Sequence, residues 1–101
     1  MALVKVAAVS QLPPGSVMEA RIGENSYAVC NVDGELHVLE GICPHAGGPL
    51  GEGTLNGNNI VCPWHGYEFD CRTGVNDMDE DLQVQTYAVV IQGGDILIEI
   101  P

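Results

Sequence analysis

The sequence predicts an all-β fold, and three observations support this class. Turn-forming groups of Gly, Pro, Asn and Asp recur at short intervals, the segments between them are short and rich in apolar and β-branched residues, and several segments alternate apolar with polar residues. The turn signals are Pro13-Pro14-Gly15, Gly23-Glu24-Asn25, Asp33-Gly34, Asn56-Gly57 and Gly93-Gly94. Strands joined by tight turns are therefore expected along most of the chain.

The strands can be justified in chain order. In residues 1–12, Val4 and Val6 flank Lys5, which favours a strand over the helix that this segment could otherwise form. Residues 18–22 alternate apolar Met, Ala and Ile with Glu and Arg, as a half-buried strand does. The pairs Asp33-Gly34 and Gly93-Gly94 suit tight hairpins with positive φ. After the second pair, the Ile residues at 96, 98 and 100 give one strand face that is wholly apolar.

The length and composition predict one domain with an unusual middle. A chain of 101 residues has no room for two cores. Residues 41–74 are rich in Gly, Pro and Cys and lack regular periodicity, so we expect an inserted subdomain there, on a β base formed by residues 1–40 and 75–101. Gly47, Gly48 and Gly66 would let the backbone approach a bound group closely.

The charge of the chain limits its partners. Fourteen acidic and three basic residues give a net charge of −11, so no basic patch can meet the phosphates of a nucleic acid. A positively charged protein is the natural complement, with electrostatic attraction speeding the encounter; the alternative is that the acidity serves solubility alone. No apolar run reaches eighteen residues and the N-terminus has no signal-peptide pattern, so we expect a cytoplasmic protein that does not enter a membrane.

The motif with the clearest chemistry is a spacing of Cys and His. Cys43-Pro44-His45 is followed, sixteen residues later, by Cys62-Pro63-Trp64-His65, which gives C-x-H-x16-C-x2-H. Two thiolates and two imidazoles on two loops can hold a metal centre. A structural zinc site uses the same donors, although zinc fingers usually place both Cys in one pair and both His in the other. A metal-free site is the third alternative.

The residues around the motif resemble the cluster-binding boxes of the Rieske family, whose [2Fe–2S] cluster has two Cys on one iron and two His on the other. The similar segments are 43–50, Cys-Pro-His-Ala-Gly-Gly-Pro-Leu, and 62–74, Cys-Pro-Trp-His-Gly-Tyr-Glu-Phe-Asp-Cys-Arg-Thr-Gly. Residues 27–41 and 87–100 also look like strand pairs of this family. The resemblance implies the Rieske fold, with an antiparallel β-sandwich base. It also implies one [2Fe–2S] cluster per chain, held by Cys43, His45, Cys62 and His65.

The chain departs from the respiratory Rieske proteins at several positions. Gly48 and Trp64 stand where those proteins carry two further Cys joined by a disulfide, so that brace is absent. Tyr67 and Phe69 stand where they carry a Ser and a Tyr that hydrogen-bond the cluster and a Cys ligand. Fewer such bonds stabilise the reduced state less, which predicts a potential near the low end of the Rieske range, around −150 mV.

The segment after the second box also departs from the family. Residues 75–100 contain no proline, although a proline-bearing loop commonly shields the cluster there. The acidic run Asp77, Asp79, Glu80 and Asp81 stands in that segment instead. It is interpreted either as a solvated loop or as a patch that docks a partner.

The remaining Cys and His residues limit the chemistry further. Cys30 and Cys71 are interpreted as free thiols in a reducing cytoplasm, with a disulfide between them as the alternative. His37 is expected to be structural, and Trp64 to pack beside the cluster. A Rieske oxygenase also needs a mononuclear iron held by two His and a carboxylate. With His45 and His65 committed, the chain cannot build that site.

The resemblance therefore implies an electron-transfer protein and not an enzyme. We expect a monomeric one-electron carrier between a flavin-dependent ferredoxin reductase and a terminal oxygenase, both with basic docking surfaces. The alternatives are a small Rieske-type subunit of a reductase such as nitrite reductase, and a zinc-stabilised interaction module.

Overall fold

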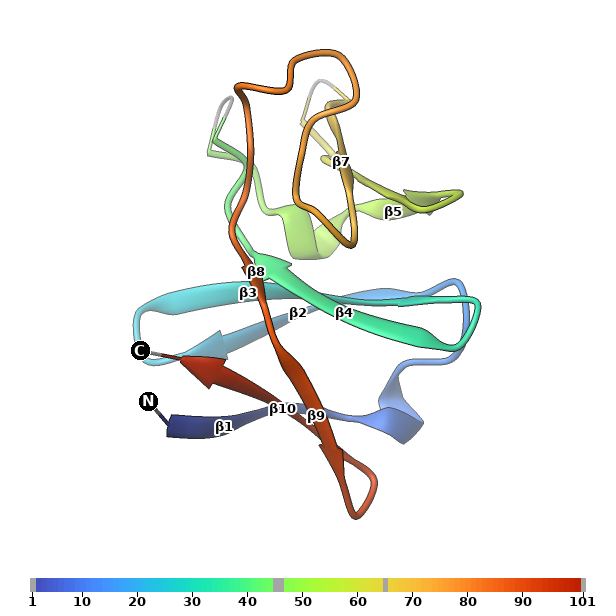
Figure 1. The fold of residues 1–101 in the computed structure, drawn as a ribbon, viewed down its shortest axis with the longest axis vertical. Coiled ribbons are helices and arrows are strands. Elements are labelled where there is room, and N and C mark those ends of the chain that lie inside the picture. Colours follow the sequence, from blue (N-terminus) through green and yellow to red (C-terminus); the bar gives the residue numbers. More distant parts are fainter. Residues whose placement is uncertain (1, 45–46, 65, 101) are drawn as a thin grey trace.

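The computed structural model describes residues 2–44, 47–64 and 66–100, and these form three antiparallel sheets. The first sheet has the order β1-β10-β9, the second β2-β3-β4-β8 and the third β5-β6-β7. In Figure 1 they lie as three layers, with the second sheet between the other two. The predicted all-β class is confirmed.

The strands follow one another along the chain with short connections. Their bounds are β1 Ala2–Ala8, β2 Val17–Ile22, β3 Asn25–Val32, β4 Glu35–Glu40, β5 Thr54–Asn56, β6 Asn59–Val61, β7 Glu68–Asp70, β8 Thr86–Tyr87, β9 Val89–Gln92 and β10 Asp95–Ile100. Two 3-10 turns, Val9–Gln11 and Leu50–Glu52, are the helical elements in this part of the chain. Neither of them is long or apolar enough to cross a membrane.

The predicted hairpins form for the expected backbone reason. Asp33 and Gly34 have φ values of 52° and 93°, and Gly93 and Gly94 have 56° and 84°. Two successive residues with positive φ twist a two-residue turn in the same sense as its strands. Residues 2–11 form strand β1 and then the 3-10 turn Val9–Gln11, so the expectation of a strand there is confirmed.

The first and second sheets enclose a core that we call the lower core. It consists of Ala7, Leu12, Ala20, Tyr27, Val29, Val38, Ile96 and Ile98. Ile96 and Ile98 are fully buried, which confirms the apolar face predicted for the last strand. Tyr27 packs edge-on against Tyr87 of β8, with ring centroids 5.2 Å apart.

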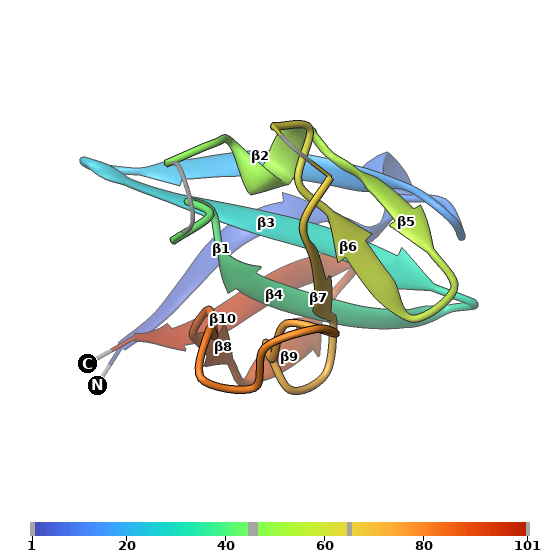
Figure 2. The same cartoon turned by 90° about the horizontal axis from the view of Figure 1, so that it is seen from above.

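A second core, which we call the upper core, lies on the other face of the middle sheet. It consists of Ala28, Cys30, Leu39, Cys43, Leu50, Ile60, Cys62, Phe69, Cys71 and Val84. Successive residues of β3 point to opposite faces, so Ala28 and Cys30 enter the upper core while Tyr27 and Val29 enter the lower one. The third sheet and the loops around it cover this face, as Figure 2 shows from above.

Candidate metal centre

The two Cys of the motif each begin a loop, and the two loops close in the same way. The Cys43 amide donates to the Gly48 carbonyl at 2.9 Å, and the Cys62 amide donates to the Tyr67 carbonyl at 2.7 Å. Each acceptor lies five residues after its Cys. Each is preceded by a glycine in the left-handed region, with φ of 77° at Gly47 and 72° at Gly66. Glycine adopts this conformation without the steric cost that a side chain would add.

The two loops bring the Cys side chains together in the upper core. Cys43 is fully buried and Cys62 is 1% exposed, and their thiols lie within hydrogen-bonding distance of each other. Burial raises the pKa of the Cys62 thiol, whereas a hydrogen bond from the Trp64 backbone amide to its sulfur lowers it. Two adjacent buried sulfurs, one of which accepts a backbone N–H, form a donor set that suits an iron–sulfur cluster.

The other two predicted ligands, His45 and His65, lie outside the described residues, as does Ala46. The structure therefore places Cys43 and Cys62 and leaves the full set of four as a prediction. For the same reason, the ranges that are described contain no group of three or more His, Cys, Asp and Glu that could hold a metal ion.

Trp64 occupies the space between the two loops. A Cβ on Gly48 would lie 2.9 Å from the Cγ of Trp64 and 2.9 Å from the Sγ of Cys62. The indole thus packs on the Gly48 backbone, and this agrees with the packing role expected of it. Gly48 and Trp64 stand at the two positions that a disulfide joins in respiratory Rieske proteins. The contact between them therefore fills the space that this disulfide would take.

Tyr67 and Phe69, which stand where the respiratory Rieske proteins carry a Ser and a Tyr, differ in burial. Phe69, on β7, is fully buried in the upper core with Cys43 and Cys62. Tyr67 is half-buried and packs against that core, and its carbonyl closes the second loop. Phe69 brings no hydroxyl into this core, so the ring contributes packing alone.

Asn76 holds the segment after the second loop in place, a role that the sequence did not reveal. This residue is 6% exposed, and its side-chain amide donates to the Glu68 carbonyl at 2.9 Å. Its Oδ1 accepts the amides of Met78 at 3.0 Å and Asp79 at 2.8 Å. The acidic run Asp77–Asp81 is thus tied to β7 through a buried side chain. The sequence signal for this role was the position of Asn76 directly before the acidic run, because an Asn side chain there can form an Asx turn.

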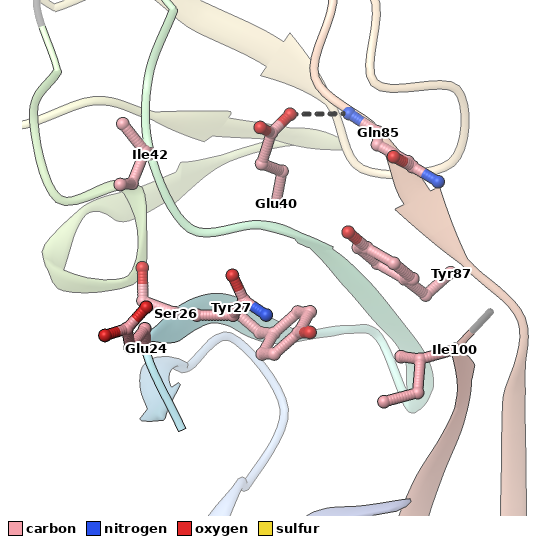
Figure 3. Close-up of a pocket in the computed structure, with 9 residues that line it drawn as sticks. Glu24, Ser26, Tyr27, Glu40, Ile42, Gln85, Tyr87 and Ile100 are labelled. Carbon is pink, nitrogen blue, oxygen red and sulfur yellow. Dashed lines mark hydrogen bonds between the residues drawn. The ribbon is translucent and has the colours of Figure 1, made fainter. Parts of the chain in front are cut away.

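A pocket of about 290 Å3 lies beside the first loop, and Figure 3 shows its lining. Glu40 accepts the Gln85 amide at 3.1 Å, and Ile42, which precedes Cys43, is 53% exposed at its rim. Burial raises the pKa of Tyr87, and Tyr27 and Glu40 add to the shift. The described lining holds no Cys or His, so this pocket adds acidic surface next to the loop and no further ligand.

The remaining predicted residues take other places. His37 lies on β4, where its Nε2 is 2.9 Å from Glu35 Oε1, in keeping with a structural role. Cys30 and Cys71 are both buried and carry free thiols. Their side chains also interact with each other, although Cys30 and Cys71 are 41 residues apart in sequence.

Comparison with known proteins gives one consistent family. The Rieske [2Fe–2S] domain matches residues 2–88. The ferredoxin component of biphenyl 2,3-dioxygenase from Rhodococcus jostii is 32% identical, over 99% of this chain and 94% of that protein. The ferredoxin of Sphingomonas yanoikuyae B1 superposes with a TM-score of 0.89 at 30% identity, covering 99% of this chain and 100% of that one.

Two further solved structures bear on function. The complex of reduced oxygenase and oxidised ferredoxin in carbazole 1,9a-dioxygenase matches with a TM-score of 0.84 at 31% identity, over 95% of this chain and 91% of that one. A structure assigned as an NADH-dependent nitrite reductase small subunit from Mycobacterium tuberculosis has a TM-score of 0.85 over 96% of this chain and 93% of that one. Its identity is only 19%, so it shows the fold alone.

These matches, with the two joined Cys loops, define the class: the chain belongs to the Rieske [2Fe–2S] family, and its cofactor is a [2Fe–2S] cluster. Within that family it is a ferredoxin, an electron-transfer component of the kind that serves dioxygenase systems, and not a catalytic enzyme. When bound, the cluster accepts and releases one electron.

Proposed function

We propose that this ferredoxin is a monomeric, cytoplasmic carrier that takes single electrons from a flavin-dependent reductase and delivers them to a terminal oxygenase. The observation that carries the proposal is the donor set: Cys43 and Cys62 meet in one core, and the sequence supplies His45 and His65 on the same two loops. We propose these four residues as the cluster ligands, with the two imidazoles on the iron that faces the partners.

We propose the loop end of the molecule as the docking surface for both partners. Apolar side chains are exposed beside both Cys, with Ile42 at 53% and Trp64 at 48%, and Met78 is 89% exposed in the segment that Asn76 holds. Met78 and Asp77 line a hollow of about 630 Å3 that also includes Gly66 of the second loop. An exposed apolar centre with a charged rim is typical of protein interfaces.

We propose that the partners have basic docking surfaces, because this chain carries a net charge of −11 and a basic surface would attract it. Of its three basic residues, Lys5 lies 3.2 Å from Asp95 and Arg21 lies 3.1 Å from Glu19. The four carboxylates of the Asp77–Asp81 run are exposed. Long-range attraction between opposite charges raises the association rate and weakens with salt.

The test measures electron transfer to an added oxygenase by stopped flow as salt rises through about 0.15 M, where the Debye length is roughly 8 Å. Replacing Asp77, Asp79 and Asp81 by Asn and Glu80 by Gln should reduce the salt dependence while the visible spectrum is unchanged. The matched control neutralises four exposed carboxylates of the first two sheets and their turns, namely Glu24, Asp33, Glu35 and Glu99.

Equal salt dependence in both variants would reject this patch as the docking surface. Failure of the reduced protein to be reoxidised by any oxygenase would reject the carrier itself. In that case stable co-elution with a reductase on gel filtration would identify the alternative, a reductase small subunit.

A further inference from the structure

A second pair of cysteines lies in the upper core, apart from the proposed ligands. Cys30 lies on β3 of the middle sheet, and Cys71 directly follows β7 of the third sheet. Cys30 is fully buried and Cys71 is 1% exposed. The two thiols interact with each other. The Cys30 Sγ lies 3.6 Å from the carbonyl oxygen of His37, and His37 and Cys71 line the same cavity.

The two thiols differ in their access to small molecules. A cavity of about 220 Å3 is lined by Cys71 but not by Cys30, and by His37, Arg72 and the β3–β4 turn. Asp33, Glu35 and Arg72 in its lining are exposed, so the cavity reaches solvent. This cavity therefore gives a small oxidant access to Cys71 from outside and none to Cys30.

The thiols also differ in their readiness to ionise. The hydrogen bond from Cys30 lowers the pKa of Cys71, despite burial and the nearby Asp70. The same bond, together with burial, raises the pKa of Cys30. Since the thiolate is the nucleophile in thiol oxidation, Cys71 is the member of the pair that reacts first.

We propose that Cys30 and Cys71 form a peroxide-sensitive dithiol, in which peroxide oxidises Cys71 first and Cys30 then converts the product to a disulfide. In the first step the Cys71 thiolate attacks one oxygen of hydrogen peroxide, the O–O bond breaks, and a sulfenic acid and hydroxide form. In the second step the Cys30 sulfur displaces the hydroxyl group of that sulfenic acid, so that a disulfide and water form. Peroxide is reduced by two electrons and the two thiols are oxidised.

The disulfide would join two layers of the molecule. Cys30 lies on β3 of the middle sheet, and Cys71 directly follows β7 of the third sheet. The disulfide would therefore link the middle sheet to the third sheet, next to the loop that begins at Cys62. Cys43 and Cys62 stay available to the cluster.

The experiment treats the cluster-loaded protein with stoichiometric hydrogen peroxide and follows the visible spectrum and the intact mass. The expected result is a loss of about 2 Da, mapped by peptide analysis to a Cys30–Cys71 bond, with the visible bands retained and the mass restored by dithiothreitol. Cys30→Ser should instead accumulate the Cys71 sulfenic acid, which a 1,3-dione captures. The matched variant, Cys71→Ser, should lose this reaction and leave Cys30 unmodified.

Three outcomes would overturn the proposal. The first is bleaching of the cluster before any disulfide forms, and the second is an unchanged mass in the parent protein. The third is equal reactivity of the two thiols, in which Cys30 of the Cys71→Ser variant reacts with peroxide as fast as Cys71 of the Cys30→Ser variant. Visible bands in both variants that match the parent's show that each has folded and retains its cluster.

Discussion

The two cores of this ferredoxin share one sheet but are built differently. The lower core is made of Ala, Val, Leu and Ile with one Tyr, and its boundaries are regular strands and two-residue turns. The upper core contains all four cysteines and Phe69, and much of its boundary is loop. Burial of apolar surface suffices to stabilise the first, whereas the second depends on hydrogen-bonded loops and a bound cluster. The difference predicts that damage to the metal centre stays in the upper core.

Removal of a sulfur ligand tests this difference with the largest expected effect. Cys43→Ser or Cys62→Ser should abolish cluster assembly, because each removes one of the two sulfurs that meet in the upper core. The visible bands should disappear, while amide exchange in β1 and β10 of the lower core stays slow. Cys30→Ser and Cys71→Ser are the controls and should keep the parent spectrum. A bleached Cys71→Ser protein would show that the ligand assignment is wrong.

Two glycines give the next largest contrast. An alanine Cβ at Gly48 would lie 2.9 Å from both the Cys62 sulfur and the Trp64 ring, so Gly48→Ala should lower cluster occupancy several-fold. Gly34→Ala, in a turn of the middle sheet, meets open space and costs only the positive φ of 93°, about 1–2 kcal/mol.

Iron content per protein and urea unfolding separate the two effects of these glycine variants. A fully loaded Gly48→Ala protein would mean that the loops can move apart without cost, contrary to the packing described above.

Asn76→Ala should destabilise the upper core by about 1–3 kcal/mol, because it removes three side-chain hydrogen bonds to the backbone of Glu68, Met78 and Asp79, each worth roughly 0.5–1.5 kcal/mol. The expected signs are a lower urea midpoint and faster cluster loss at fixed urea. Asn59→Ala is the matched control, since its side chain bonds Glu68 at 3.2 Å at a half-buried position. If both variants lose the cluster at the same rate, Asn76 has no special role in holding the segment after the second loop.

The smallest expected effect concerns the reduction potential of the cluster in the upper core. Phe69→Tyr adds a hydroxyl within the core that holds both Cys, and a hydrogen bond to sulfur favours the reduced cluster. The potential should rise by tens of millivolts, up to about 100 mV, when measured by voltammetry at fixed pH and salt. Phe69→Leu changes the packing without adding a donor and should give no such rise. An unchanged potential in Phe69→Tyr would mean that the ring edge does not face the cluster.

The sequence predicted the all-β class, both hairpins and the cofactor, because these depend on local turn chemistry and on short motifs around Cys43 and Cys62. It did not predict that the two metal loops close alike. The unequal Cys–His spacings indicated two different halves, whereas the shared feature is a hydrogen bond from each Cys to the fifth residue after it.

The bonds of Asn76 were missed, and the approach of Cys30 to Cys71 was considered only in the alternative interpretation, a disulfide between them. The Asn76 bonds are local, and their signal was a polar residue able to form an Asx turn. The approach of the two Cys instead arises from how the third sheet packs on the second, and no local pattern encodes that packing. The roles of His45 and His65 remain predictions.

The central position of β3 has a consequence for misfolding. If this strand slipped by one residue against β2 and β4, Tyr27 and Val29 would turn toward the metal centre, and Ala28 and Cys30 toward the first sheet. The bulky tyrosine would then overfill one core, and the small alanine would leave a void in the other. Register is thus specified from both sides of one strand, so an alternative pairing that could seed aggregation must disrupt two cores at once.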